Sequence, residues 1–220
     1  MTLYRDGRPL AYLLFWKSVA GKQVVHWNLT GPDDDKLLSV FPSRPFLASV
    51  PMRRIADVIT ARGSATVRPI EMMENRGPLE QVSITGGTVR KLTEGDHSQV
   101  SEILQEGPRD FAEAYKSMNL DIHNAWGSFD VHGLASVAFV SVMLPEVWVL
   151  NGVFTSPKFR EKGHAKSVVS VIVRTALEHG AIAGLYVNSD NAAAQRTYKR
   201  LGFKPIEHRA MIETIEDPST

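Results

Sequence analysis

Four cationic side chains surround one glycine, Gly163, in residues 154–167, which read FTSPKFREKGHAKS. The four are Lys158, Arg160, Lys162 and Lys166. A strand-like run precedes this segment and an apolar stripe of helical period follows it, so the cations lie where a strand turns into a helix. The unpaired N–H groups and the dipole at the start of a helix favour phosphate. The segment therefore predicts a phosphate-binding turn, with a solvated basic turn as the alternative.

The composition limits what else the chain can bind. Among 220 residues, 25 Lys and Arg nearly balance 24 Asp and Glu, so we expect a local anion site and no nucleic-acid or membrane partner. The sequence has no cysteine, which excludes a thiol nucleophile and Cys-based zinc sites, and we expect no metal. No window is apolar enough for a membrane span and no signal-peptide pattern is present. We therefore expect a cytoplasmic protein.

The residues around the cationic turn are predicted to form one α/β domain, 86–220. The expected strands before the turn are Ala125–Val131, Leu134–Met143 and Val147–Thr155, and the expected helices are 94–104 and 108–120. After the turn, the segment KSVVSVIVRTALEHG (residues 166–180) has a β-branched run of high strand propensity. Its apolar residues nevertheless recur with helical spacing, and Gly180 lies where a helix C-cap glycine belongs. We predict a helix there, followed by a strand at AGLYVN, a helix at 191–201 and one or two strands in PIEHRAMIETI.

The segment before this domain, 1–85, is predicted to form a smaller α/β unit. AYLLFW, VVHWNL and FLASV are typical of strands, and RIADVIT is typical of a helix. The segment ENRGPLEQVSITGG, residues 74–87, has two turn signals and no apolar stripe, which places the domain boundary there. This unit carries no motif that indicates a chemistry.

A second motif lies beyond the cationic turn, in NAAAQRTYKRLGF, residues 191–203. The residues at its fixed offsets are Asn191, Ala194, Tyr198, Gly202 and Phe203. Together with Arg160, Gly163 and Ala165 of the turn, in the same order and at similar spacing, they resemble the two motifs of the GNAT superfamily, the acetyl-CoA-dependent N-acetyltransferases. The resemblance extends over positions 88–215. The pattern VHWNLTG…FP in the first unit is faintly similar to the glycine-acyltransferase-like branch, in which a degenerate acetyltransferase-like unit comes first.

This resemblance implies the fold and the cofactor. The fold would be an α/β (α+β) GNAT fold, with a mixed, mostly antiparallel twisted sheet flanked by helices. Acetyl-CoA would bind with its pyrophosphate on the backbone amides of the turn and its pantetheine arm along the strand that ends at Thr155, near a bulge that Gly152 suits. The residues assigned to the cofactor in this way are Val153, Phe154, Thr155, Arg160, Glu161, Lys162, Gly163, His164, Ala165, Lys166, Asn191, Ala194 and Tyr198.

The resemblance also suggests catalytic residues. Tyr198 occupies the general-acid position of the family and would return a proton to the departing thiolate. The general base is open, because the strand 147–152 has no carboxylate inside it. Glu146 precedes that strand and is a candidate, and Asn151 could instead position a water molecule. Four further candidates lie in neighbouring segments: Asp121, His123, Glu207 and His208.

The predicted function is an N-acetyltransferase that transfers the acetyl group from acetyl-CoA to a primary amine by direct attack in a ternary complex. The amine belongs to a small molecule or a peptide, and its identity stays open at this point. Residues 106–124 and the segment around 205–209 are expected to line the acceptor pocket. A coenzyme A-binding sensor or scaffold without catalysis is the alternative. The protein could act as a homodimer.

Overall fold

The chain forms two compact units, each built from more than one segment of the sequence. A computed structural model describes residues 2–5, 8–17, 23–29, 38–39, 41, 46–63, 65–77, 87–107 and 122–214. The first unit comprises Met1–Glu71, Asn188–Asp190 and Glu207–Thr220, and the second comprises Met72–Val187 and Asn191–Ile206. The predicted boundary at 85/86, the predicted helix 108–120 and Asp121 lie outside the described residues.

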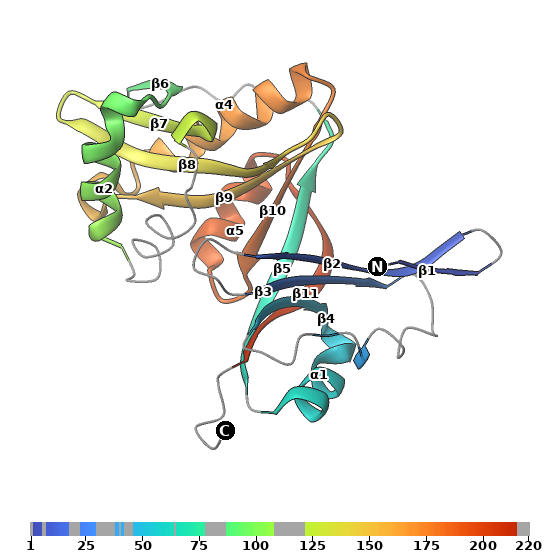
Figure 1. Cartoon of the computed structure of the whole chain (residues 1–220). Coiled ribbons are helices and arrows are strands. Elements are labelled where there is room, and N and C mark those ends of the chain that lie inside the picture. Colours follow the sequence, from blue (N-terminus) through green and yellow to red (C-terminus); the bar gives the residue numbers. More distant parts are fainter. Residues whose placement is uncertain are drawn as a thin grey trace. The chain divides into compact units, whose positions relative to one another are not determined.

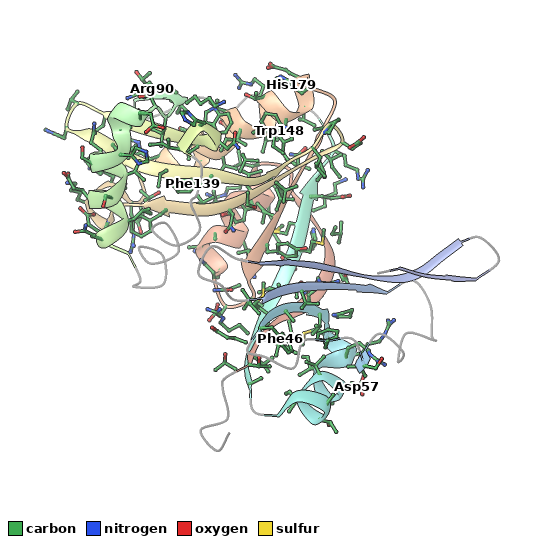
Figure 2. All side chains as sticks on the ribbon, in the orientation of Figure 1. Phe46, Asp57, Arg90, Phe139, Trp148 and His179 are labelled. Carbon is green, nitrogen blue, oxygen red and sulfur yellow. The ribbon has the colours of Figure 1, made fainter. Side chains whose placement is uncertain are left out.

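Among its described residues, the first unit is a mixed sheet with one α-helix. Its elements are β1 (Thr2–Arg5), β2 (Arg8–Lys17), β3 (Gln23–Leu29), β4 (Phe46–Pro51), α1 (Ile55–Arg62) and the outer parts of β5 (Ala65–Asn75) and β11 (Lys204–Thr214). The strands follow the order β1-β2-β3-β4-β11-β5. β3 and β4 run parallel, whereas β4 pairs antiparallel with β11 from Arg209↔Pro51 to Glu213↔Leu47. Phe46, labelled in Figure 2, belongs to the buried core between these strands and α1.

The second unit is a larger sheet with helices on both faces (Figure 1). Its own elements are β6 (Thr88–Lys91), α2 (His97–Gln105), β7 (Ala125–Asp130), β8 (Gly133–Met143), β9 (Val147–Thr155), α4 (His164–Glu178), β10 (Ile182–Asn188) and α5 (Ala192–Arg200). The strand order is β5-β10-β9-β8-β7-β6. Neighbours from β6 to β9 pair antiparallel, and β9 pairs parallel with β10.

Alternation along β8 explains why both faces of this sheet are covered. Ala138 and Val140 face one core, which the apolar stripe of α4 and the end of α5 complete. Val137 and Phe139 face the other core, which α2 completes. Successive residues of a strand point to opposite faces, so a strand that is apolar on both needs a layer of helix on each side. The mixed, mostly antiparallel fold class predicted from the sequence is confirmed.

The conflict at residues 166–180 is resolved in favour of the helix. α4 runs from His164 to Glu178 and buries Val168, Val169, Ile172 and Val173 against the sheet. Its C-terminal turn ends at Gly180, whose φ is +78°. The β-branched residues lose side-chain freedom in a helix, but their burial outweighs that cost of a few tenths of a kcal/mol each.

The sequence did not indicate β5. Its sequence ATVRPIEMMEN has no clean alternation and contains Pro69, which cannot donate to a ladder. The strand nevertheless lies between β11 and β10. The final segment forms a single long strand, β11. Among the helices described, none combines the length and the apolar character that crossing a bilayer requires.

Candidate active site

The cationic turn joins β9 to α4, and two of its residues adopt the left-handed backbone conformation. A 3-10 turn, Pro157–Phe159, is followed by Glu161 with a φ of +62° and Gly163 with a φ of +86°. Gly163 is the N-cap residue of α4, and its carbonyl oxygen accepts the first intrahelical bond from Ser167 N–H. No side chain of the described chain caps this helix. The N–H groups of the first helical turn therefore point out of the helix, as an anion-binding turn requires.

An aromatic ring holds two of the cations beside this turn. The ring of Phe159 is buried, and its centroid lies 5.1 Å from Lys158 Nζ and 5.5 Å from Lys162 Nζ. Cation–π attraction at this distance orders flexible lysines without neutralising them. Arg160 is exposed, and its Nε lies 3.4 Å from the carbonyl oxygen of Thr155. The turn thus keeps its positive charge facing outward.

Ser156 is a part of this turn that the sequence did not single out. It follows β9 directly and is almost fully buried, and its Oγ has no hydrogen-bond partner within the described chain. An unsatisfied buried hydroxyl is costly and indicates a partner that a ligand or water supplies. No spacing rule could have identified Ser156.

The buried side chain of His164 attaches the turn to the sheet. Its side chain is 2% exposed, and its Nδ1 shares a hydrogen bond of 2.9 Å with Oγ of Ser128, a fully buried residue of β7. The edge of its ring also packs on Phe159, with centroids 5.7 Å apart. Burial lowers the pKa of His164; the Asp130 carboxylate opposes this shift and Lys162 adds to it. The imidazole is therefore held neutral, and it contacts the protein interior rather than the outside of the turn.

The strand before the turn bends at Gly152. In the β8–β9 ladder, Val137 pairs with Phe154 and Phe139 pairs with Asn151, so two residues of β9 oppose Ala138 alone. Gly152 has a φ of +60°, and its N–H donates to Oδ1 of Asn151 at 2.8 Å. This is a β-bulge in which glycine supplies the left-handed residue. The predicted bulge is confirmed.

The pairing between β9 and β10 stops just before the bulge. The parallel register runs from Ile182↔Val147 to Leu185↔Leu150, although β9 continues to Thr155 and β10 to Asn188. Over 151–155, β9 stays paired with β8. A strand that is laddered on one side only presents backbone N–H and C=O groups that an extended ligand can pair with.

The second motif mainly shapes α5. Oδ1 of Asn191 accepts from Ala194 N–H at 3.1 Å, so Asn191 is the N-cap. Gly202, with a φ of +79°, ends the helix. The Tyr198 side chain is 8% exposed, and its ring meets Phe203 edge-on at 5.8 Å. Burial raises the pKa of Tyr198 to about 12.

Two base candidates lie along or next to β9. Glu146 is exposed just before the strand begins, about 20 Å of extended backbone from the bulge. The side chain of Asn151 is exposed and bonded to the bulge itself. Asn151 is therefore the candidate that lies beside the unladdered edge.

The other base candidates that the structure describes lie beside charged side chains. Nε2 of His123 lies 3.0 Å from Glu94. In the first unit, Glu207 accepts from Arg209 at 2.7 Å, and His208 faces Glu71. Among the described residues, no group of His, Asp or Glu could hold a metal ion.

Comparison with known proteins identifies this arrangement. Residues 134–212, which include the bulge, the turn, α4 and α5, match the model of a family described as FR47-like protein. A GNAT-family protein of Novosphingobium aromaticivorans DSM 12444 is 18% identical, with 87% of this chain and 84% of that chain covered and a TM-score of 0.61. The chain has the GNAT fold. The resemblance to this superfamily, predicted from the two motifs, is confirmed.

Two further solved structures extend over the first unit as well. A Drosophila protein is 15% identical, with 93% and 74% of the two chains covered and a TM-score of 0.71. A tandem GNAT protein from the clavulanic acid biosynthesis pathway is 13% identical, with 100% and 83% covered and a TM-score of 0.57. Among curated proteins the sequence has no significant match. The similarity of the segment 1–85 to the glycine-acyltransferase-like branch stays a prediction.

The neutral, buried His164 makes stability depend on pH. The unfolded chain binds a proton at a pKa of about 6.5, whereas the folded chain resists it, so the free energy of unfolding should be at its plateau above about pH 6.5 and fall as the pH drops below it. We expect the free energy of unfolding, measured with urea at several pH values between 5 and 8, to depend less steeply on pH for His164→Asn than for the wild type. His179→Asn, an exposed histidine at the end of α4, is the control. Equal slopes for His164→Asn and wild type would contradict this prediction.

Proposed function

We propose that this protein is a cytoplasmic N-acetyltransferase that moves the acetyl group of acetyl-CoA to a primary amine in a ternary complex. The observation that carries the proposal is the end of the β9–β10 ladder at Leu150 beside the bulge at Gly152. An extended amide-containing arm can pair with the backbone of 153–155 there, next to a turn that suits phosphate. The unladdered end of β9 and the turn follow one another along the chain, as a long ligand with a pyrophosphate at one end needs.

The turn suits the phosphate end of acetyl-CoA. The N–H groups of 162–166 and the dipole of α4 would hold the pyrophosphate, and Lys158 and Lys162 lie beside it on Phe159. The buried Oγ of Ser156 could donate to an oxygen of the same group. These donors are fixed before the ligand arrives, so binding would cost little ordering of the backbone.

The chemical step is a direct acyl transfer. The deprotonated amine attacks the thioester carbonyl carbon, a C–N bond forms, and the carbonyl oxygen becomes an oxyanion near the backbone N–H groups of the bulge. The C–S bond then breaks, and the thiolate takes a proton that Tyr198 would supply. The chain has no cysteine, so no acyl-enzyme on sulfur can intervene. Asn151, on the bulge, could hold a water molecule that carries the amine proton away.

Two observations favour the alternative function, a coenzyme A-binding sensor. β9 carries no carboxylate, and the buried Tyr198 has a pKa of about 12. Proton transfer from such a phenol to a thiolate, whose pKa is about 8.5, is uphill unless it accompanies C–S cleavage. A sensor would bind coenzyme A as tightly as an enzyme does, but it would release no free coenzyme A from acetyl-CoA.

Release of free thiol from acetyl-CoA distinguishes the acetyltransferase from the sensor. We expect the protein to release free coenzyme A from acetyl-CoA in the presence of one class of primary amine, followed with a thiol-reactive dye. The protein adds no background because it has no cysteine. Calorimetric titration with coenzyme A runs alongside. Binding without thiol release across protein N-termini, lysines, amino acids, polyamines and amine-bearing antibiotics would favour the sensor.

The variant Gly163→Glu tests the phosphate-binding turn. A side chain at a φ of +86° is strained, and its carboxylate would repel phosphate, so we expect affinity for coenzyme A to fall at least about tenfold. Gly180→Glu is the matched control, because Gly180 has a φ of +78° at the other end of α4 and open space around it. Equal loss of affinity in both variants, or in neither, would place the phosphate elsewhere.

The variant Tyr198→Phe tests the general acid. Phenylalanine keeps the edge-on contact with Phe203 and removes only the hydroxyl. We expect kcat to fall at least about tenfold with little change in affinity for coenzyme A, measured by steady-state thiol release and by calorimetry. Full turnover in this variant would show that the proton comes from solvent.

A further inference from the structure

α5 and the residues that follow it carry a second group of cations, which the proposed function does not use. Residues 191–206 contain no Asp or Glu, although acidic and basic residues nearly balance over the whole chain. The cations of this segment are all exposed, and they are Arg196, Lys199, Arg200 and Lys204. Among the residues that the structure describes, none of the four has an ion-pair partner. The segment is therefore a local excess of positive charge on a nearly neutral protein.

The three cations of α5 lie on the face of the helix that points away from the core. Arg196, Lys199 and Arg200 are spaced i, i+3 and i+4, so they are neighbours on one face. The opposite face carries Tyr198 and Ala194, which pack in the core of the second unit. Like charges at this spacing repel one another and destabilise a helix slightly. The helix dipole offsets this repulsion for the two cations of the last turn, but not for Arg196, which lies in the middle of the helix.

α5 begins at the same edge of the sheet as the cationic turn. β9 and β10 run parallel, so their C-terminal ends lie at one edge of the sheet. α4 follows β9 and α5 follows β10, and the two helices contact each other over one shared core. The nine residues of α5 extend over about 13 Å, little more than the Debye length of about 10 Å at 0.1 M salt. The charges of α5 therefore act on an anion that approaches the turn.

An anionic ligand would meet the field of both cationic groups before it binds. Positive charges around an approach path raise the association rate of an anion, and salt screens the effect. Coenzyme A carries its phosphates at one end, and its pantetheine arm is uncharged. The combined field would therefore draw the phosphate end of the ligand towards the turn.

We propose that the basic face of α5, formed by Arg196, Lys199 and Arg200, speeds the capture of the phosphate-bearing ligand by the cationic turn and does not touch the ligand once it is bound. The side chains of this face point away from the core that α4 and α5 share, which suits a long-range role. The inference rests on the coenzyme A binding in the proposed function and requires no turnover. It therefore applies to the acetyltransferase and to the sensor alike.

The triple variant Arg196→Gln, Lys199→Gln, Arg200→Gln tests this role, because it removes three charges from an exposed face. Coenzyme A that carries a fluorescent dye on its sulfur is mixed with the protein in a stopped-flow instrument, and anisotropy reports association and dissociation. At about 20 mM salt we expect the association rate constant to fall at least about fivefold, with the dissociation rate constant unchanged. At about 0.5 M salt the difference should shrink to less than about twofold, because salt screens the field.

A pair of single variants gives a matched control. Arg196→Glu reverses a charge four residues from the start of α5, whereas Arg174→Glu reverses an exposed charge ten residues from the start of α4. At low salt we expect Arg196→Glu to slow association more than Arg174→Glu does, since the field falls off with distance.

The rate constants also define what overturns the proposal. Equal association rate constants for wild type and the triple variant at low salt overturn it. A raised dissociation rate constant with unchanged association also overturns it, because α5 would then contact the bound ligand. Failure of wild type to bind coenzyme A overturns both this inference and the proposed function. Binding without thiol release contradicts only the acetyltransferase.

Discussion

The end of the β9–β10 ladder at Leu150 is the constraint on which the candidate site depends. Upstream of it, β9 is an ordinary interior strand with a partner on each side. Downstream, the bulge at Gly152 turns the strand while β8 still holds its other edge, so that 151–155 stays extended with one edge unladdered by β10. The bend also sets the direction in which the chain leaves the sheet. The cationic turn and the start of α4 follow from that direction.

A buried contact then fixes the turn to the sheet. The hydrogen bond between His164 and Ser128 joins the first residue of α4 to β7, and the ring of Phe159 lies between that imidazole and two lysines. A loop that must present backbone N–H groups to a charged ligand has to be rigid before the ligand arrives. The groups that fix this turn are neutral and buried, and its charged groups are exposed. The turn is therefore rigid without a charge in the core.

The sequence predicted the elements of the second unit well, since each had its own local signal. The helical stripe of α4 outweighed its β-propensity, and glycines at 152, 163 and 202 marked positions that do have positive φ. Features that depend on distant neighbours were not predictable. β5 lacks a periodic pattern, and the buried His164 bonds to Ser128 of β7, 36 residues earlier in the sequence. The motif residue Tyr198 was found by spacing, but only the structure reveals how deeply it is buried.

The register between β4 and β11 has a consequence for how the protein is made. Ser49 pairs with Met211 and Leu47 with Glu213, so a strand from the first quarter of the sequence must meet one from its end to complete the first sheet. A ribosome adds about 5–20 residues each second, so β4 would wait on the order of ten seconds for its neighbour. During that time its apolar residues, Phe46 and Val50 among them, lack the strand that later covers one edge. The first sheet can therefore close only after nearly the whole chain has been made, and until then β4 lacks its β11 neighbour.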